Sequence, residues 1–330
     1  MIFTCTNCEG NMVYSPEKKV MFCPYCESQG SQEKRHVNVG NLTKFCPNCG
    51  GEIAIGEHDS AMQCPYCDNY IIQDARIEEP FKPDYVVPFK MGKETMKKRF
   101  KEHFRKFRFA PTDFLTETRL NSIQGWYVPF WFYDYDTRCT LKGEGTKVRS
   151  WTNGNMSYTE TSYYDVARII DIPYNKIPAD ASVQMPDDVM DLMEPYNYQE
   201  METFQPEFLS GFHGEKYNMT AETLGGRARE KMEKSAKEYL RSTCAGYASF
   251  SKNQETVDIT GSKISYGLLP VWRYLYEYNG KEYPFYVNGQ TGKIVGAAPI
   301  SKKKVCAYSI TFGALVTLLL GILNLYAMLS

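Results

Sequence analysis

Two segments of the chain carry apolar residues at the spacing of an α-helix. Within residues 220–241 an apolar residue recurs at every fourth position, at Leu224, Ala228, Met232, Ala236 and Leu240. This spacing predicts a helix with one buried face, and Thr220 supplies the hydroxyl that an N-cap needs. In the basic segment 90–108, a second stripe consists of Met96, Phe100, Phe104 and Phe107. We expect a helix here that ends before Pro111, since proline cannot continue it.

Other segments have the composition and turns of β-strands. Segments 138–149 and 158–170 are rich in β-branched and aromatic residues, and the Asn-Gly-Asn sequence at 153–155 predicts a hairpin turn between them. Residues 268–296 predict a β-meander whose first turn is Asn-Gly at 279–280. Pro284 would place its strand at a sheet edge. The aromatic run 125–136 is expected to lie in the core.

The last apolar segment has no polar face. Residues 305–329 contain no charged residue and are rich in Leu, Ile, Val and Ala. As a helix they reach about 37 Å, enough to cross a bilayer core of about 30 Å. Three lysines at 302–304 precede the segment. The positive-inside rule then predicts a tail-anchored, single-pass protein of the cell membrane with the bulk of its chain in the cytoplasm.

Small residues recur at every fourth position of this segment, at Ser309, Gly313, Thr317 and Gly321. They would lie on one helix face and allow a second helix to approach closely. Association through this stripe is one hypothesis, and the ordinary abundance of glycine in membrane helices is the other. Asn324 adds a polar group that favours a partner within lipid.

Eight of the eleven cysteines form two copies of one pattern, 41 residues apart. In each copy two Cys-x2-Cys pairs are separated by fourteen residues; the copies are Cys5, Cys8, Cys23, Cys26 and Cys46, Cys49, Cys64, Cys67. Four thiolates are what one tetrahedral Zn²⁺ needs, so the sequence predicts two zinc ions. Because four sulfurs leave no open position for water, the metal is expected to be structural. Both copies contain Cys-Pro-Tyr-Cys, which favours two tandem zinc ribbons of short antiparallel strands.

Other uses of these cysteines compete with zinc. Disulfides are disfavoured because the N-terminus does not resemble a signal peptide and the cytosol keeps thiols reduced. Iron at the same ligands and a thioredoxin-type redox pair remain alternatives. After the second cysteine of a pair, a positive φ is expected at Gly10, Gly50 and Gly51. The three remaining cysteines are expected to be core or membrane thiols, at Cys139, Cys244 and Cys306.

The distribution of charge bears on the partners. Residues 1–75 carry five Lys or Arg against nine Asp or Glu, which argues against phosphate binding by the ribbons. Segment 90–108 carries nine Lys or Arg against two Glu. Its basic face would be solvated, would contact anionic lipid, or would bind nucleic acid. Segment 187–207 has seven acidic and no basic residues, and is expected either against the basic helix or in a solvated loop.

Motifs of catalysis are absent from the sequence. It contains no P-loop, dinucleotide fingerprint, HExxH or nucleophile elbow. The four histidines are scattered, at His36, His58, His103 and His213. We therefore expect no enzyme, and a catalytic central domain would need a polar cleft with convergent carboxylates or histidines.

Several longer segments add to the cysteine pairs. They are Val-Pro-Phe-Lys at 87–90, Phe-Ala-Pro at 109–111, Gly-Trp-Tyr-Val-Pro-Phe-Trp at 125–131, Leu-Leu-Pro-Val-Trp at 268–272 and Val-Asn-Gly-Gln-Thr-Gly-Lys at 287–293. Together they resemble a bacterial family of TFIIB-type zinc-ribbon membrane proteins, associated with phage-shock and SPFH-type envelope-stress proteins in Bacillus-like bacteria. The resemblance spans nearly the whole chain. It implies recruitment of an SPFH-domain partner to the membrane, and no catalytic residues.

The patterns together predict an α+β protein in four parts. Zinc ribbon 1 would occupy 1–40, zinc ribbon 2 41–75, a mixed α+β cytoplasmic domain 76–300 and a transmembrane helix 305–329, with residues 76–88 as a linker or edge segment. The expected function is that of a zinc-binding adaptor that recruits a protein partner to the membrane. A membrane-tethered nucleic-acid binder and an unrecognised enzyme are the alternatives.

Overall fold

A sheet of ten strands organises the part of the chain that the computed structural model describes, residues 1–30, 32–35 and 44–329. Its main path runs β10-β7-β12-β8-β11-β5-β6, and β9, β13 and β14 pair beside it. The strands are β5 (Asp59–Gln63), β6 (Tyr70–Ile72), β7 (Tyr85–Val86), β8 (Gln124–Asn153), β9 (Met156–Asp180), β10 (Glu202–Thr203), β11 (His213–Glu215), β12 (Ser249–Tyr278), β13 (Lys281–Asn288) and β14 (Ile294–Val295). With its helices, the chain is mixed α+β, as predicted.

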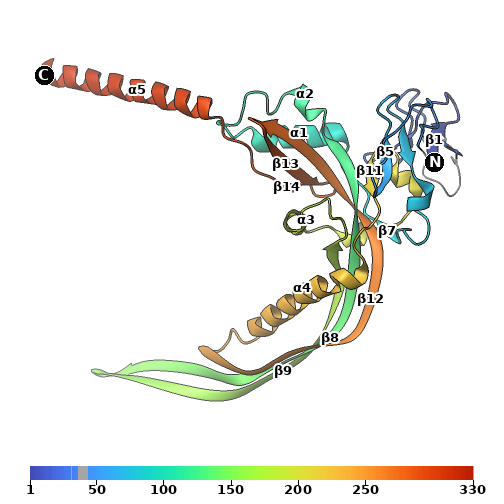
Figure 1. Cartoon of the computed structure of the whole chain (residues 1–330). Coiled ribbons are helices and arrows are strands. Elements are labelled where there is room, and N and C mark those ends of the chain that lie inside the picture. The colour runs from blue at the N-terminus through green and yellow to red at the C-terminus, as the bar shows by residue number, and fades with distance from the viewer. Residues whose placement is uncertain (31, 36–43, 330) are drawn as a thin grey trace.

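Three long antiparallel strands form the curved part of this sheet (Figure 1). β8 pairs with β12 along one side and with β9 along the other. Beyond the pair Thr146–Ser249, β8 and β9 continue alone as a two-stranded hairpin. The predicted hairpin is confirmed, and Gly154 at its turn has a φ of +61°. Both strands are longer than predicted: β8 includes the aromatic run 125–136, and β9 extends to Asp180.

Helix α4 (Ala221–Ser242) confirms the first helical prediction, and packs against β8 and β9 (Figure 1). The residues of its predicted apolar stripe are all buried. The Thr220 hydroxyl accepts a hydrogen bond from the Thr223 amide at 3.5 Å, so the predicted N-cap is present.

Helix α1 (Lys93–Phe104) is shorter than the predicted segment 90–108. Met96, Phe100 and Phe104 are buried as expected, but Phe107 lies beyond the helix and is 49 % exposed. The helix ends because the Phe107 amide bonds back to the carbonyl of Phe104, in a turn. A short helix α2 (Glu117–Leu120) follows.

The meander of residues 268–296 is confirmed as β12, β13 and β14. Asn279 and Gly280 have positive φ at its first turn, as a type I′ turn requires. Pro284 pairs with Leu275 of β12, while β14 pairs only with Tyr286 and Val287. Pro284 therefore lies at a sheet edge, where the absence of an amide hydrogen interrupts no hydrogen-bond ladder.

The acidic segment 187–207 contains helix α3 (Asp187–Met193), the 3-10 turns η2 (Tyr198–Glu200) and η3 (Pro206–Leu209) and strand β10. Its main basic partner is α4, with Arg227 to Asp187 at 2.7 Å and Lys231 to Asp191 at 2.7 Å. The 90–108 segment provides one ion pair to it, Lys90 to Glu200 at 2.6 Å. The predicted choice between basic helix and solvated loop is therefore incomplete, because half-buried basic side chains of α4 also reach this segment.

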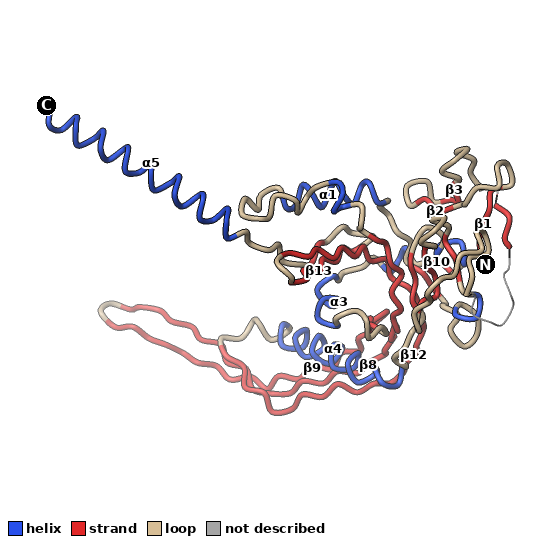
Figure 2. Tube along the Cα trace, turned by 45° about the horizontal axis from the view of Figure 1, so that its top comes forward, coloured by secondary structure: helices blue, strands red, loops and turns tan. Residues whose placement is uncertain are grey.

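The C-terminal helix α5 (Lys302–Leu329) projects away from the body, on the side opposite the N-terminus (Figures 1 and 2). Its span Lys302–Leu325 contains an 18-residue window with a mean hydropathy of 2.1 and no buried residues. By length and composition this is the one helix in the described residues that is apolar enough to cross a membrane.

Two small units carry the paired cysteines. We call residues 1–30 and 32–35 module 1 and residues 44–73 module 2. Module 1 contains β1 (Ile2–Cys5), β2 (Val13–Ser15), β3 (Val20–Phe22) and β4 (Gln32–Arg35), in the pairs β1-β4 and β2-β3. The predicted boundary between the ribbons, at 40 and 41, lies outside the described residues.

The main sheet extends across the predicted boundary between zinc ribbon 2 and the central domain, at 75 and 76. β5 and β6 of module 2 are strands of this sheet, and a 3-10 turn η1 (Asp74–Arg76) follows them. The predicted linker 76–88 contains β7, which lies between β10 and β12. Module 2 is therefore continuous with the central domain.

Candidate metal centres

The first four cysteines gather at one point. Cys5 and Cys26 have their sulfurs 3.6 Å apart, and those of Cys8 and Cys23 are 3.5 Å apart. All four Sγ atoms lie within 4.8 Å of one another. The structure thus brings together the complete predicted ligand set of the first copy.

The second copy repeats this geometry. Cys46 and Cys67 have their sulfurs 3.6 Å apart, and those of Cys49 and Cys64 are 3.8 Å apart, again with all four within 4.8 Å. In each module the first cysteine of each pair is buried and faces the core. The second is exposed or half-buried, so each site sits at the rim of its module.

Each Cys-x2-Cys pair is shaped by the same backbone turn. In module 1 the amides of Glu9 and Glu27 donate to the carbonyls of Cys5 and Cys23, at 2.9 Å each. In module 2, Gly50 and Asp68 donate to Cys46 and Cys64, at 2.8 and 3.0 Å. All four donors have a positive φ, between 58° and 74°. The turn directs both sulfurs of a pair toward one point, where a single metal ion could bind them both.

The predicted role of the glycines is right at one position only. Gly50 has a positive φ, but the equivalent left-handed residue of the other turns is Glu9, Glu27 or Asp68. Gly10 and Gly51 have other backbone conformations, and an added Cβ would lie 2.6 and 2.5 Å from the ring of the tyrosine in the opposite pair. These two glycines therefore make room for Tyr25 and Tyr66.

Polar groups beside the sulfurs were missed by the sequence reasoning. The Ser28 hydroxyl lies 3.0 Å from Cys5 Sγ and 3.2 Å from Cys26 Sγ. Hydrogen bonding to Ser28 lowers the pKa of Cys5 to about 6 and also lowers the pKa of Cys26. A lowered pKa favours the thiolate, which is the metal-binding form. In module 2 the Asn48 side-chain amide donates to Cys67 Sγ at 3.6 Å.

The sulfur distances fit a four-thiolate metal ion. A tetrahedral Zn²⁺ with Zn–S bonds of about 2.3 Å places its sulfurs about 3.8 Å apart. A disulfide needs about 2.05 Å, far shorter than any pair here, and all eight cysteines are free thiols. Each site can thus hold one ion in a closed coordination sphere, with no position left for a substrate.

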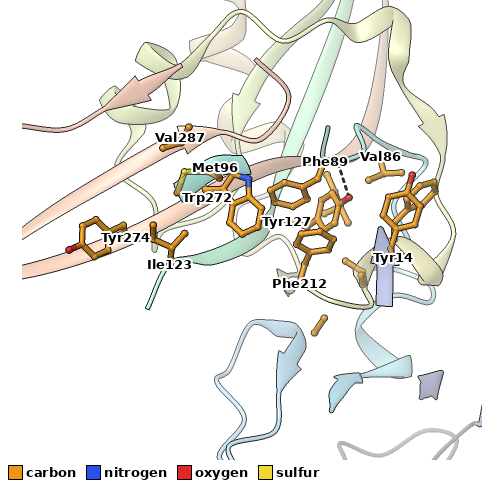
Figure 3. Packing of buried hydrophobic residues seen from close by; sticks show 14 of the residues in the cluster. Tyr14, Val86, Phe89, Met96, Ile123, Tyr127, Phe212, Trp272, Tyr274 and Val287 are labelled. Atoms are coloured by element: carbon orange, nitrogen blue, oxygen red, sulfur yellow. Dashed lines mark hydrogen bonds between the residues drawn. The ribbon is translucent and has the colours of Figure 1, made fainter. Parts of the chain in front are cut away.

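Module 1 is attached to the body mainly through side chains (Figure 3). Tyr14 packs its ring on Phe208 at 4.9 Å, within the cluster that contains Phe89 and Tyr127. Two hydrogen bonds join the same surfaces: the Tyr14 amide to the Ser210 carbonyl at 2.8 Å, and the Ser210 hydroxyl to the Met12 carbonyl at 2.6 Å. Phe3, Met12 and Met21 belong to this core too.

Module 2 is attached through its backbone. β11 lies between β5 and β8, pairing Gly214 with Ala61 on one side and His213 with Trp126 on the other. The His213 ring stacks on the Trp126 ring at 4.6 Å, and burial lowers the pKa of His213 to about 4. Module 2 keeps a small core of its own, formed by Ile2, Cys46, Ile53, Cys64 and Ile71. Since Ile2 comes from β1, this core also ties the two modules together.

A search of curated proteins finds the uncharacterized protein YdjG of Bacillus subtilis strain 168. It is 38 % identical over 233 residues, which cover 71 % of this chain and 68 % of YdjG. The chain belongs to the YdjG family. No protein-family model matches the chain, and no solved structure matches it. Membership of the YdjG family assigns no reaction or partner by itself.

The remaining cysteines and histidines lie apart from these sites. Cys139 and Cys244 are buried in the core under α4, and Cys306 is exposed on α5, as expected of core and membrane thiols. No histidine belongs to either ligand group within the described residues. His103 meets the Phe104 ring edge-on and stacks on the Phe107 ring, and His36 lies outside the described residues.

A buried acidic pair was also missed. Asp180 and Glu215 are each 1 % exposed, and Ser182 donates to Glu215 at 2.5 Å. Desolvation raises the pKa of Asp180 to about 8 and also raises that of Glu215. Both carboxyls are shielded from solvent, and the Ser182 hydroxyl links the end of β9 to Glu215 of β11.

Proposed function

We propose that this protein is a membrane-anchored, zinc-binding cytoplasmic adaptor that recruits a protein partner to the membrane. The observation that carries the proposal is the separation of two closed four-thiolate sites from the apolar helix α5, on opposite sides of one body (Figure 1). A closed site has no position for a substrate, so its contribution is to fix the shape of a surface.

The metal would be Zn²⁺, one structural ion in each of two tandem zinc ribbons. The sulfur spacing and the four matching turns support this assignment. Zinc at four thiolates adds folding free energy to units too small to fold by hydrophobic burial alone. Iron accepts the same ligands, so metal analysis of the purified protein is the direct check.

Helix α5 would be the anchor, with Lys302, Lys303 and Lys304 on the cytoplasmic side. Its exposed apolar surface supports insertion in lipid. The stripe of Ser309, Gly313, Thr317 and Gly321 would then allow a second helix to pack against it.

The partner surface is proposed at the exposed rim of the cysteine modules. Tyr25 and Tyr66 occupy equivalent positions and are 71 % and 68 % exposed. The exposed acids Glu9, Glu27 and Asp68 occupy the turns of the same sites. Tyrosines often carry much of the binding energy of protein interfaces, and the acids favour a partner with a basic patch. The family resemblance in the sequence suggests an SPFH-domain or phage-shock protein in envelope stress as that partner.

Nucleic-acid binding receives less support from the basic segment 90–108. Lys90, Lys97 and Lys101 are neutralised by Glu200, Glu94 and Glu117. Lys93 and Arg99 donate to backbone carbonyls. Among the described residues, Lys98, Arg105, Lys106 and Arg108 make no such contact, which leaves fewer than half of the nine cations of the segment free to follow a phosphate backbone.

The test is a crosslinked affinity pulldown of the full chain from native membranes, read by mass spectrometry. We expect one dominant partner that is lost in a Tyr25→Ala, Tyr66→Ala double variant whose metal content is unchanged. The Cys46→Ser, Cys49→Ser variant should lose the second ion and the partner while it stays in the membrane fraction. The matched control is Tyr163→Ala, Tyr239→Ala, which removes two exposed tyrosines elsewhere.

An enriched partner that is recovered equally with the tyrosine and cysteine variants would contradict the proposed surface. Repeated recovery of the bait alone would contradict the adaptor role. Recovery of nucleic acid that is released steeply by salt would favour the alternative function.

A further inference from the structure

The root of α5 is surrounded by a surface that the proposed adaptor function leaves unused. The chain after α1 and the chain before α5 lie side by side and line a groove of about 330 Å³. Its apolar floor includes Phe107, Phe109 and Ile300, which are 49 %, 36 % and 66 % exposed. We call these three residues, with Arg105, Lys106 and Arg108, the juxtamembrane surface.

This surface is fixed to α5 by direct contacts. The Ser301 amide donates to the Phe109 carbonyl at 2.8 Å, and Lys304 Nζ donates to the Ala110 carbonyl at 2.7 Å. The Phe109 ring meets the Tyr308 ring edge-on at 5.5 Å. Because Tyr308 lies in the second turn of α5, a bilayer that holds this helix would meet the juxtamembrane surface first.

The cations here differ from those along α1. Arg105, Lys106 and Arg108 are exposed, and no side-chain hydrogen bond or ion pair engages them within the described residues. The same holds for Lys302 and Lys303 at the start of α5. Five unpaired positive charges thus surround an exposed apolar groove beside the candidate membrane helix.

We propose that the juxtamembrane surface docks on anionic phospholipid headgroups, with Phe107, Phe109 and Ile300 in the interfacial layer. Lysine and arginine bind the negative cytoplasmic leaflet, and exposed apolar side chains enter the headgroup boundary beside them. This second contact would fix the tilt of the body on the bilayer, and so the height at which the cysteine modules stand above it. The inference rests on the membrane anchor of the proposed function.

The experiment uses the full chain with a photo-crosslinking benzoylphenylalanine in place of Phe107. The protein is reconstituted in vesicles of phosphatidylcholine alone, or with about one third phosphatidylglycerol. Flotation reports anchoring by α5, and mass spectrometry reports the yield of lipid crosslinks. We expect flotation with both vesicles, and a crosslink yield about fivefold or more higher with the anionic lipid.

The charge variant is Arg105→Gln, Lys106→Gln, Arg108→Gln, which should lower the anionic yield to the neutral level without changing flotation. The matched control, Lys142→Gln, Lys234→Gln, Lys263→Gln, removes three exposed cations elsewhere and should change neither.

The outcomes separate this inference from the anchor. Flotation with both vesicles but equal crosslink yields overturns the docking surface and leaves the anchor standing. Flotation with neither overturns the anchor and the surface with it. Crosslinks to a protein rather than lipid in native membranes would assign this surface to a protein partner.

Discussion

The two cysteine modules have similar sequences and the same arrangement of four sulfurs, yet they are joined to the body differently. Module 1 is held mainly by side chains, since Phe3, Met12 and Tyr14 enter the main core. Module 2 is held mainly by backbone pairing, since β5 continues the ten-stranded sheet through β11, although Ala61 and Ile72 also enter that core. One motif is thus compatible with two kinds of attachment.

The difference predicts how a local loss of structure would spread. Loss of side-chain packing exposes a hydrophobic surface but leaves the sheet intact. Loss of a paired strand leaves unsatisfied hydrogen-bonding groups on its neighbour, here the three residues of β11. Module 2 should therefore be coupled to the fold of the central domain, and module 1 mainly to its surface.

The largest expected effect comes from removing one buried ligand in each module, by Cys64→Ser or Cys23→Ser. Each variant should bind one metal ion instead of two, with loss of most of the folding free energy of its module, on the order of 10 kcal/mol. Hydrogen exchange should rise in β5, β6 and β11 for Cys64→Ser. For Cys23→Ser it should rise in β2, β3 and residues 206–210. Identical exchange maps for the two variants would show that the attachments do not differ.

A pH-dependent effect is expected at the strand that joins module 2 to the body. His213 has a pKa near 4 in the folded protein, lowered by burial from an ordinary value near 6.5. Between these values the unfolded chain binds a proton that the folded chain does not, so stability is lost as pH falls from about 6.5 to 4. The loss reaches about 3 kcal/mol at the acid end.

The variant His213→Phe retains an aromatic ring to stack on Trp126 and removes this titration. Denaturant unfolding at pH 7 and at pH 4.5 should show a smaller acid loss for the variant than for the parent protein. Proton competition at the cysteine ligands affects both proteins equally, so the difference between them isolates His213. An unchanged acid loss would place the pH sensitivity elsewhere.

The parts of the fold that could be predicted from sequence depend on near neighbours in the chain. The ligands of each site fall in two pairs only fourteen residues apart, and local turns aim their sulfurs. The stripe from Leu224 to Leu240 specifies α4 by itself, and Asn279 and Gly280 specify their own turn. In each case the residues that carry the sequence signal lie within one short segment.

The attachment of module 2 depends on contacts that no local pattern reveals. β11 has three residues, and its pairing joins His213 to Trp126 and Gly214 to Ala61, which are far apart in sequence. The partner of the acidic segment was missed for the same reason, because Arg227 and Lys231 meet it only in the folded chain. Ser28 was missed at the metal site because a serine two residues after a cysteine has no distinctive signal.

A smaller effect should distinguish the docking of module 1. Ser210→Ala removes the donor to the buried Met12 carbonyl and should cost about 1–3 kcal/mol of docking, since that carbonyl is left unpaired. The matched control is Ser60→Ala in β5 of module 2, where the buried hydroxyl has no hydrogen-bond partner. Removing that hydroxyl should be neutral. Hydrogen exchange of β2 and β3 should rise for Ser210→Ala alone, and an equal rise in both variants would contradict the side-chain attachment.

The smallest effect should show where the two modules are alike. Gly10→Ala and Gly51→Ala each place a methyl group against an exposed tyrosine ring, Tyr25 or Tyr66. Because these rings can turn outward, and the alanine also restricts the unfolded chain, each change should alter stability by less than about 1 kcal/mol. The two values should agree, as measured by metal retention during denaturant titration. Gly50→Ala should cost more, about 1–2 kcal/mol, because Gly50 has a φ of +74°. Unequal changes in stability for Gly10→Ala and Gly51→Ala would mean that the difference in attachment also alters the four-cysteine sites.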